Sequence, residues 1–179
     1  MNSRKFKRIT ILLALLLSGC VQQPTILQTV TDENGVFEVR VTAFQEDRSF
    51  GRAFAGADYH FEVRTPGAGW RKIMEFHHDD QVAVGKNQVR FVNERVAYVF
   101  IGWLYAVTTD AGQTWHIWDA NNSGILGTER IGYDGIQSIK LDTEGRGRML
   151  LNVIGRQDRI ELTTEDFGIT WGLTIEQEQ

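Results

Sequence analysis

The chain has little cysteine, little proline and no long apolar run. Cys20 is the only cysteine among 179 residues, and only two residues are prolines. A single cysteine cannot form an internal disulfide, so the core must stabilise the fold without cross-links. The longest mostly apolar run, residues 9–17, is shorter than the roughly 20 residues that a membrane-spanning helix needs. These absences exclude a disulfide-stabilised scaffold and a membrane-spanning helix formed by that run.

Amphipathic helices are also missing, and alternating strands take their place. Apolar Phe37, Val39 and Val41 alternate with polar Glu38 and Arg40, and the same period of two recurs along the chain. Eighteen glycines suit many tight turns between paired strands. The sequence therefore predicts an all-β fold.

The first 19 residues have the order of a secretory signal peptide. Residues 1–8 carry four positive charges and no acid, and the apolar run and two small residues follow. The segment Leu17–Cys20 ("LSGC") resembles the lipobox of bacterial lipoproteins. That resemblance implies cleavage before Cys20 and acylation of its sulfur and new amine, and Val21 implies the outer membrane. The alternative is an ordinary signal peptide with an incidental cysteine.

Charge and composition divide the remainder of the chain. Four of the 19 basic residues lie in the first eight positions, which leaves 15 basic against 23 acidic residues and a net charge of −8. This acidic balance argues against nucleic acid as a partner. Polar residues 20–34 are predicted to be a lipidated tether, and residues 35–179 a single β-repeat domain.

A short cassette occurs twice, and a weaker copy precedes it. "TTDAGQTW" ends at Trp115 and "TTEDFGITW" ends at Trp171, 56 residues later. "TPGAGW" ends at Trp70, 45 residues before Trp115, with Thr65 where the cassettes have Asp. The cassettes divide the chain into units of about 36–76, 81–126 and 135–175. A period of 40–50 residues with about four strands per unit is typical of propeller blades.

The cassette resembles the Asp-box, or BNR, repeat of sialidases and other β-propellers. In that family the box forms the turn between the third and fourth strands of a blade, away from any active site. We therefore expect the Asp to accept backbone N–H groups about two residues on, the Gly to adopt φ > 0 and the Trp to pack over the hairpin. The matching residues are Thr108, Asp110, Gly112, Thr114 and Trp115, then Thr164, Asp166, Gly168, Thr170 and Trp171.

Three units are fewer than the four to eight blades of a propeller. One interpretation is an incomplete propeller of about three antiparallel four-stranded units. The other is a compact β-sandwich in which the units pack on one another. An incomplete propeller leaves open sheet edges, which predicts self-association or pairing with a protein partner.

Two segments are candidates for binding. The stretch His77–Asp80 ("HHDD") contains possible metal ligands, but neighbours on a strand point to opposite faces, so a solvated loop is favoured and no cofactor is expected. Long loops on a rigid scaffold often carry recognition. The first predicted contact segment is the loop 46–58, and the second is the loop 118–135. The residues predicted to contact a partner are Phe50, Arg52, Phe54 and Tyr59.

These features favour a non-catalytic, lipid-anchored protein-binding module at the periplasmic face of the outer membrane. An envelope assembly or scaffold subunit fits, and so does an immunity lipoprotein that neutralises a toxin. The alternative is a glycan-binding module or a degenerate sialidase-like hydrolase. A sialidase-like enzyme would need an Arg cluster with a Tyr nucleophile and its acid partner, and another glycan hydrolase would need a pair of carboxylates that converge in a cleft. The tyrosines of this sequence show no link to its arginines.

Overall fold

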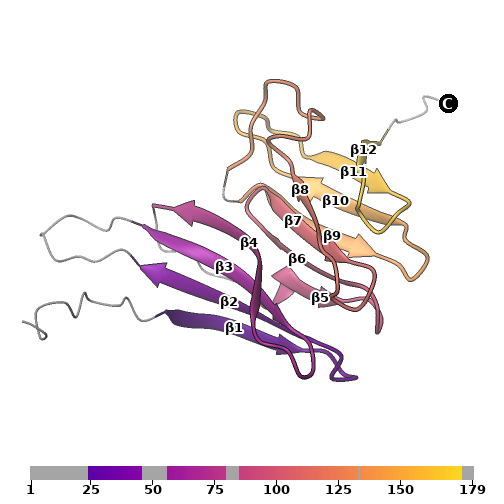
Figure 1. Cartoon of the computed structure of the whole chain (residues 1–179). Helices are drawn as coiled ribbons and strands as arrows, with labels where there is room; N and C mark the ends of the chain where they lie inside the picture. The colour runs from indigo at the N-terminus through magenta and orange to yellow at the C-terminus, as the bar shows by residue number, and fades with distance from the viewer. Residues whose placement is uncertain (1–23, 46–55, 80–84, 133, 175–179) are drawn as a thin grey trace, which may run out of the picture.

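The computed structural model describes residues 24–45, 56–79, 85–132 and 134–174, and these form three separate β-sheets (Figure 1). Within these ranges the only helical element is the single 3-10 turn η1 (Lys86–Gln88). The predicted all-β class is confirmed, as are the three antiparallel four-stranded units.

Each sheet is a four-stranded antiparallel meander in which neighbours in sequence are neighbours in space. Sheet A contains β1 (Thr25–Thr31), β2 (Glu38–Gln45), β3 (Ala57–Arg64) and β4 (Arg71–His78). Sheet B contains β5 (Val89–Phe91), β6 (Ala97–Ile101), β7 (Leu104–Thr108) and β8 (His116–Asp119). Sheet C contains β9 (Ile136–Leu141), β10 (Gly147–Leu151), β11 (Ile160–Thr164) and β12 (Gly172–Leu173). None of the three sheets closes into a barrel.

Sheet B lies between the other two sheets, and its two central strands are buried on both faces. Every residue of β6 and β7 is buried. Because side chains alternate along a strand, Val99 and Ala106 join the core shared with sheet A, whereas Tyr98 and Tyr105 join the core shared with sheet C. The three sheets therefore form one stack, A–B–C, with a separate apolar layer at each junction.

The two outer faces of this stack are polar. On sheet A the alternating residues that point away from sheet B include Glu38, Arg40 and Glu62. On sheet C, Arg148 and Glu161 point away from sheet B and form an ion pair at 3.4 Å. Terminal units of a repeat stack need polar outer faces for solubility, so neither face resembles the apolar junctions inside the stack.

The first unit begins earlier than the sequence suggested. The segment predicted as a tether, residues 20–34, contains β1, which pairs with β2 along its whole length. Its pattern was missed because a β-bulge between Ile26 and Gln28 interrupts the alternation. The observed units span residues 25–78, 89–119 and 136–173.

Candidate functional site

Both cassettes form the same hydrogen-bonded turn. The first lies between β7 and β8 and the second between β11 and β12, the third and fourth strands of sheets B and C. In the first, the buried hydroxyl of Thr108 accepts the N–H of Gly112 at 2.9 Å and donates to Asp110 Oδ1 at 2.9 Å. The carboxylate of Asp110 also accepts the N–H of Thr114 at 2.8 Å and its hydroxyl at 2.6 Å.

The second turn repeats these contacts with nearly the same lengths. Thr164 Oγ1 lies 2.9 Å from Gly168 N and 2.7 Å from Asp166 Oδ1. Thr170 donates to Asp166 from its N–H at 2.9 Å and from its hydroxyl at 2.6 Å. The N–H and hydroxyl donors belong to the Thr four residues after the Asp, not to a residue two positions on as expected. The Thr two residues before the Asp adds a further hydroxyl donor. Both carboxylates are therefore fully engaged in holding a turn.

The backbone of each turn is left-handed over two successive residues. Gly112 and Gly168 have φ of +82° and +81°, as expected for glycine. The residues before them, Ala111 and Phe167, also have positive φ, at +57° and +61°. A non-glycine residue in this region is strained. The hydrogen bonds around each Asp compensate for that strain.

Acid should weaken these turns. Burial opposes ionisation of Asp110, but hydrogen bonds from Thr114 and Thr108 outweigh it and hold its pKa at about 2, below the ordinary 3.8. The pKa of Asp166 is lowered against burial in the same way, by Thr170 and Thr164. A lowered folded-state pKa contributes stability that is present above the unfolded pKa of about 4 and is lost as the pH falls through the folded value.

The expected result is a urea midpoint that falls between about pH 4 and about pH 2. Asp110→Asn and Asp166→Asn should each lower the midpoint at pH 6 and flatten its fall with acid, because the titrating carboxylate is gone. Other acidic groups contribute equally to the fall of the urea midpoint with acid in wild type and in both variants. Equal slopes in wild type and variants would contradict this prediction.

Each cassette turn docks on the preceding sheet. The guanidinium of Arg71 in β4 donates to the carbonyls of Gly112 and Gln113 at 2.9 and 3.2 Å. The hydroxyl of Tyr105 in β7 donates to the carbonyl of Phe167 at 2.7 Å. The cassette turns therefore connect consecutive units as well as closing hairpins.

The cassette Trp rings take part in the same junctions. Trp115 packs edge-on against Phe37 of the preceding unit, with ring centroids 6.3 Å apart. Trp171 packs edge-on against Tyr105 at 5.7 Å. Each ring thus lies in the apolar layer between two sheets, where it adds an aromatic contact to the hydrogen bonds.

The first unit lacks this arrangement because no sheet precedes it among the described residues. Its β3–β4 connection, residues 65–70, has six residues, whereas 109–115 and 165–171 have seven. Thr65 nevertheless occupies the backbone position of the cassette Asp, because its carbonyl accepts the N–H of Ala68 as those of Asp110 and Asp166 accept the N–H three residues on. Pro66 and Gly67 are exposed, and Trp70 is half-buried on the outer face of sheet A.

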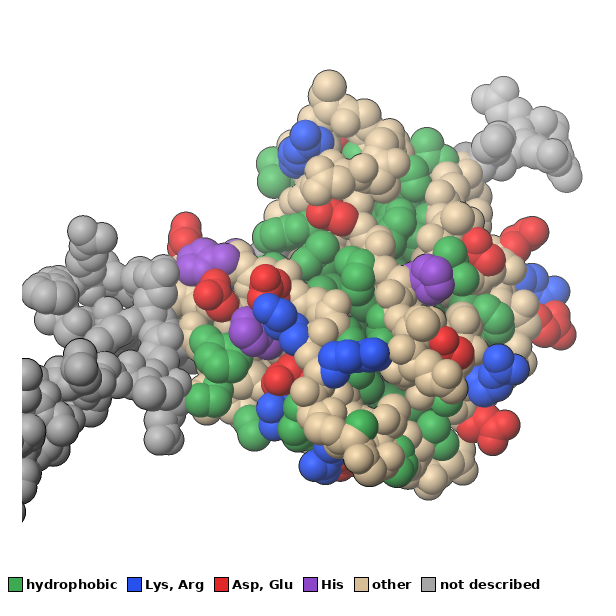
Figure 2. Space-filling view, in the orientation of Figure 1, with side chains coloured by type: hydrophobic (Ala, Val, Ile, Leu, Met, Phe, Trp, Pro, Cys, Tyr) green, Lys and Arg blue, Asp and Glu red, His purple; other side chains and the backbone are tan. Residues whose placement is uncertain are grey.

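Trp70 is the centre of a cluster of charged side chains on this outer face. The guanidinium carbons of Arg40 and Arg64 lie 4.1 and 4.8 Å from its ring centroid. Arg40 also pairs with Glu62 at 2.7 Å, and Arg64 pairs with Glu38. We call these five residues the Trp70 cluster. Figure 2 shows basic, acidic and histidine side chains interspersed over the side of the molecule that sheet A forms in Figure 1.

Electrostatics fix the cluster in one arrangement. Arg40 donates to both oxygens of Glu62, at 2.7 and 3.2 Å, and Thr42 donates to the same carboxylate at 3.0 Å. The hydrogen bond from Arg40 holds the pKa of Glu62 below its ordinary value against the opposing effect of burial. A bidentate Arg–carboxylate pair with the guanidinium on an aromatic ring leaves little side-chain freedom.

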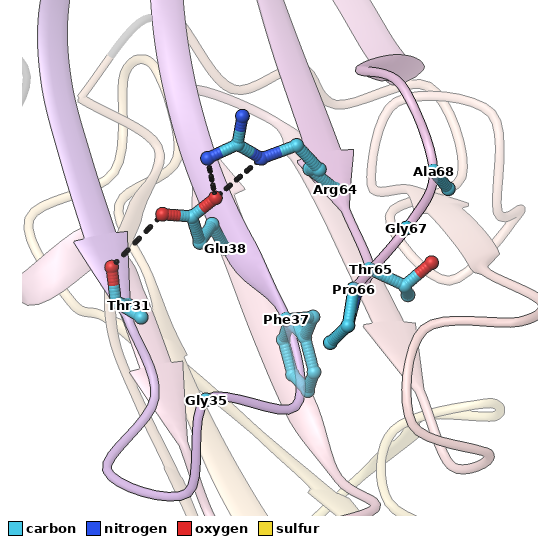
Figure 3. Close-up of a pocket in the computed structure, with 9 residues that line it drawn as sticks. All are labelled: Thr31, Gly35, Phe37, Glu38, Arg64, Thr65, Pro66, Gly67 and Ala68. Carbon is cyan, nitrogen blue, oxygen red and sulfur yellow. Dashed lines mark hydrogen bonds and ion pairs between the residues drawn. The ribbon is translucent and has the colours of Figure 1, made fainter.

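A cavity of about 350 Å³ adjoins the cluster at the turn end of sheet A (Figure 3). The Arg64–Glu38 pair forms its polar wall, with Thr31 donating to Glu38 at 3.5 Å. Phe37 and Pro66 supply apolar surface. The cavity is thus a shallow extension of the cluster with both polar and apolar walls.

The structure divides the predicted contact residues. Tyr59 is only 2% exposed and stacks on Phe76 at 5.2 Å, so it is a core residue and its predicted role in partner contact is wrong. Phe50, Arg52 and Phe54 lie outside the described residues. The alternation of β3 had already placed Tyr59 on the same face as Phe61, which is the signal that the prediction overlooked.

The second predicted contact loop, residues 118–135, is tied to its surroundings. The side chain of Asn121 donates to the carbonyl of Ile131 at 3.1 Å and accepts its N–H at 2.9 Å. Leu126 and Ile131 are buried in the core between sheets B and C. Much of this loop therefore contributes to the core, with exposed residues between the anchors.

The histidine-rich stretch forms ion pairs. His77 Nδ1 lies 2.8 Å from Asp58, and His77 Nε2 lies 3.3 Å from Asp79. The hydrogen bond with Asp58 raises the pKa of His77. Across the described ranges no three His, Cys, Asp or Glu side chains are placed to hold a metal ion. Asp80 lies outside those ranges.

Residues that sequence reasoning missed are those that connect the sheets. Arg71 and Tyr105 bind the cassette turns, and Tyr98 donates to the carbonyl of Ile139 in sheet C at 2.9 Å. Tyr98 and Tyr105 are buried, which raises the pKa of both hydroxyls. In the sequence, each of these two residues appears only as a Tyr in a strand that is apolar on both faces.

Cys20 and the predicted signal peptide lie outside the described residues. In the described part of the chain, no helix has the length and apolar character to cross a membrane. No family model matches this chain, and no curated protein matches it.

Proposed function

We propose that this chain is a lipid-anchored, periplasm-facing protein that binds another protein and catalyses no reaction. The observation that carries the proposal is the Trp70 cluster. Trp and Arg are the residues most enriched at the energetic centres of protein interfaces. Here one Trp and two Arg side chains lie together on an outer face of the stack, held in a fixed arrangement by Glu38 and Glu62.

The charge pairing favours a protein over an anionic small molecule. Each guanidinium in the cluster is already paired with a carboxylate of this chain. The face therefore presents fixed, alternating charges around an aromatic ring, which a surface of complementary charge pattern recognises. An envelope assembly or scaffold subunit and an immunity lipoprotein both fit this description.

A glycan-directed role remains the second candidate. A Trp on an outer face suits the apolar face of a sugar ring, and Trp70 is half-buried on such a face, with Arg40 and Arg64 over its ring. However, a sialidase-like clamp needs Arg side chains that are free for the substrate carboxylate, and Glu62 already engages Arg40 through both oxygens. The cluster would have to break its own ion pairs before it could hold an acidic sugar.

Co-purification from cell envelopes tests the proposal. The full chain, Trp70→Ala and Arg148→Ala are compared, with Arg148→Ala as the matched control because Arg148 pairs with Glu161 on the opposite outer face. We expect a protein that is retained by wild type and control and that binds Trp70→Ala about 30-fold more weakly, the effect of losing a hot-spot residue.

Unchanged retention by Trp70→Ala would contradict the proposal. If wild type binds anionic glycans on an array and Trp70→Ala abolishes that binding, the result would also contradict the proposal. It would support the glycan-directed role instead. Circular dichroism and melting of each variant show whether it is folded.

A further inference from the structure

The two ends of the stack differ in the connections that they carry. Strands β1, β9 and β11 all run from left to right in Figure 1, from what we call the loop end to what we call the turn end. The turn end holds both cassettes and residues 65–70. At the loop end, the N–H of Ile136 at the start of β9 donates to the carbonyl of Gly102 in sheet B at 2.8 Å. Equivalent ends of the sheets therefore lie on the same side of the molecule.

The lipid anchor of the proposed function is attached at the loop end. β1 begins there at Thr25, five residues after Cys20. An extended chain spans at most about 3.6 Å per residue, so Thr25 lies within about 18 Å of an acylated Cys20 whatever the conformation between them. The turn end lies farther off, because a strand of eight residues such as β3 is about 26 Å long. The anchor therefore holds the loop end close to the bilayer.

The loop end also carries the most exposed large apolar side chain of the described residues. Ile154, in the β10–β11 connection, is 68% exposed, and all of residues 154–159 are exposed. At the turn end of the same sheet, the cassette residue Ile169 is 37% exposed. An apolar side chain beside basic ones suits the boundary between lipid headgroups and acyl chains. Ile154 therefore projects from the end that the anchor holds near such a boundary.

Arginines surround Ile154. Arg156 and Arg159 follow it in the same connection, and the carbonyl of Arg130 accepts its N–H at 3.0 Å. All three arginines are exposed, and Arg156 pairs with Glu129 at 3.3 Å. Segments 129–130 and 154–159 together contain three basic and two acidic residues, a net charge of +1 in an acidic chain. Guanidinium groups around an apolar tip can contact lipid phosphates while the apolar side chain enters the interface.

The outer face of sheet A is less suited to lie on a bilayer. Its Arg–Glu pairs are already formed within the Trp70 cluster, and a lipid surface would have to desolvate them. At the loop end of the same sheet, the exposed Asp58 and Asp79 both pair with His77, so these two acids do not form an isolated negative patch next to the anchor. The distribution of charge therefore favours an orientation with the loop end down.

We propose that the loop end rests on the bilayer, with Ile154 inserted among the headgroups and Arg130, Arg156 and Arg159 at their phosphates. This orientation rests on the lipid anchor of the proposed function. It places the Trp70 cluster and its cavity at the end that points away from the membrane, where a protein partner can reach them. The β10–β11 connection is thus a second membrane contact, which fixes how the anchored domain stands.

Fluorescence quenching of the lipidated full chain tests this orientation. Cys20 is the only cysteine, and its sulfur is acylated in a lipoprotein, so Ile154→Cys and Ile169→Cys can each be labelled at one site with an NBD maleimide. The proteins are incorporated into vesicles of phosphatidylethanolamine and phosphatidylglycerol that contain lipid with a spin label near the headgroup. We expect blue-shifted, quenched fluorescence at position 154 and neither effect at position 169.

Charge reversal tests the arginines. In the Ile154→Cys protein, Arg159→Glu should shift the equilibrium between docked and undocked loop about fivefold toward the undocked state, seen as loss of quenching. Arg148→Glu is the matched control, because Arg148 is an exposed arginine on the outer face of sheet C, outside the β10–β11 connection. It should leave the quenching unchanged. Equal effects of the two substitutions would overturn the role given to the arginines.

Flotation of the vesicles separates the two ways in which the proposal can fail. A chain that does not float with the vesicles has no lipid anchor, which overturns both this orientation and the anchor in the proposed function. A chain that floats but shows no quenching at position 154, or equal quenching at positions 154 and 169, overturns the orientation alone. Retention of a partner protein by the Trp70 cluster is measured separately and does not decide this outcome.

Discussion

Replacing Gly168 by alanine is expected to lower the free energy of unfolding by about 2–5 kcal/mol, the sum of left-handed strain and overpacking. The φ of +81° alone disfavours any side chain. A Cβ at this position would also lie 2.7 Å from the hydroxyl of Tyr105 and 2.7 Å from the ring of Trp171. Both are buried at the junction of sheets B and C, so neither can move away easily. The Tyr105–Phe167 hydrogen bond should be lost with the displaced ring.

The chain contains a graded control series for this prediction. Gly67, Gly112 and Gly168 have nearly the same φ, at +80°, +82° and +81°. A Cβ at Gly67 meets nothing within 4 Å, and one at Gly112 meets its nearest neighbours at 3.7 Å. Gly67→Ala and Gly112→Ala should therefore cost only the strain, about 1–2 kcal/mol.

Thermal melting of the three variants measures the series. For a chain of this size each kcal/mol corresponds to about 2–4 °C, so Gly168→Ala should melt clearly below the other two. Three equal shifts would show that the contact with Tyr105 does not constrain the turn. A Gly168→Ala shift smaller than that of Gly67→Ala would contradict the docking described for this junction.

The difference between the cassettes follows from their neighbours. The turns of sheets B and C each pack on a preceding sheet, through Arg71 in one case and Tyr105 in the other. Both of these connections contain the Thr and Asp whose hydrogen bonds shape the turn. The connection in sheet A has no described sheet before it, and there the Asp is absent, one residue is missing and Trp70 is covered by arginines of its own sheet. The first unit therefore has the character of a terminal cap.

The fold class was predictable because it depends on local periodicity. Alternation such as that of Phe37, Val39 and Val41 gave the strands, and the spacing of three Trp residues gave the three units. Strand β1 was not predicted, because its bulge breaks the period and its threonines resemble a polar tether. β-branched residues make up five of its seven positions, and that propensity was the available signal.

The junctions between sheets could not be derived in the same way. Which strand faces which turn depends on tertiary packing, and a Tyr such as Tyr105 looks like any other apolar residue of a buried strand. The same limit explains Tyr59, which was grouped with nearby aromatic residues by proximity in sequence. Its alternation with His60 places it in the core with Phe61, where the structure has it.

Cys20→Ser is expected to abolish lipidation and to release the chain from the membrane fraction. The basic head, the apolar run and "LSGC" favour acylation at Cys20, and this is the only cysteine available to form a thioether. A lipoprotein carries several acyl chains, and a single chain gives only marginal membrane binding, so loss of the attachment site should remove essentially all membrane association. Labelling with radioactive palmitate, followed by fractionation of envelopes, measures both effects. Val21→Ala is the control, because it leaves the small-residue context and the cysteine in place and should label as wild type does. Equal labelling of wild type and Cys20→Ser would exclude the lipid anchor, and the proposed function would then apply to a protein that reaches its partner without a membrane attachment.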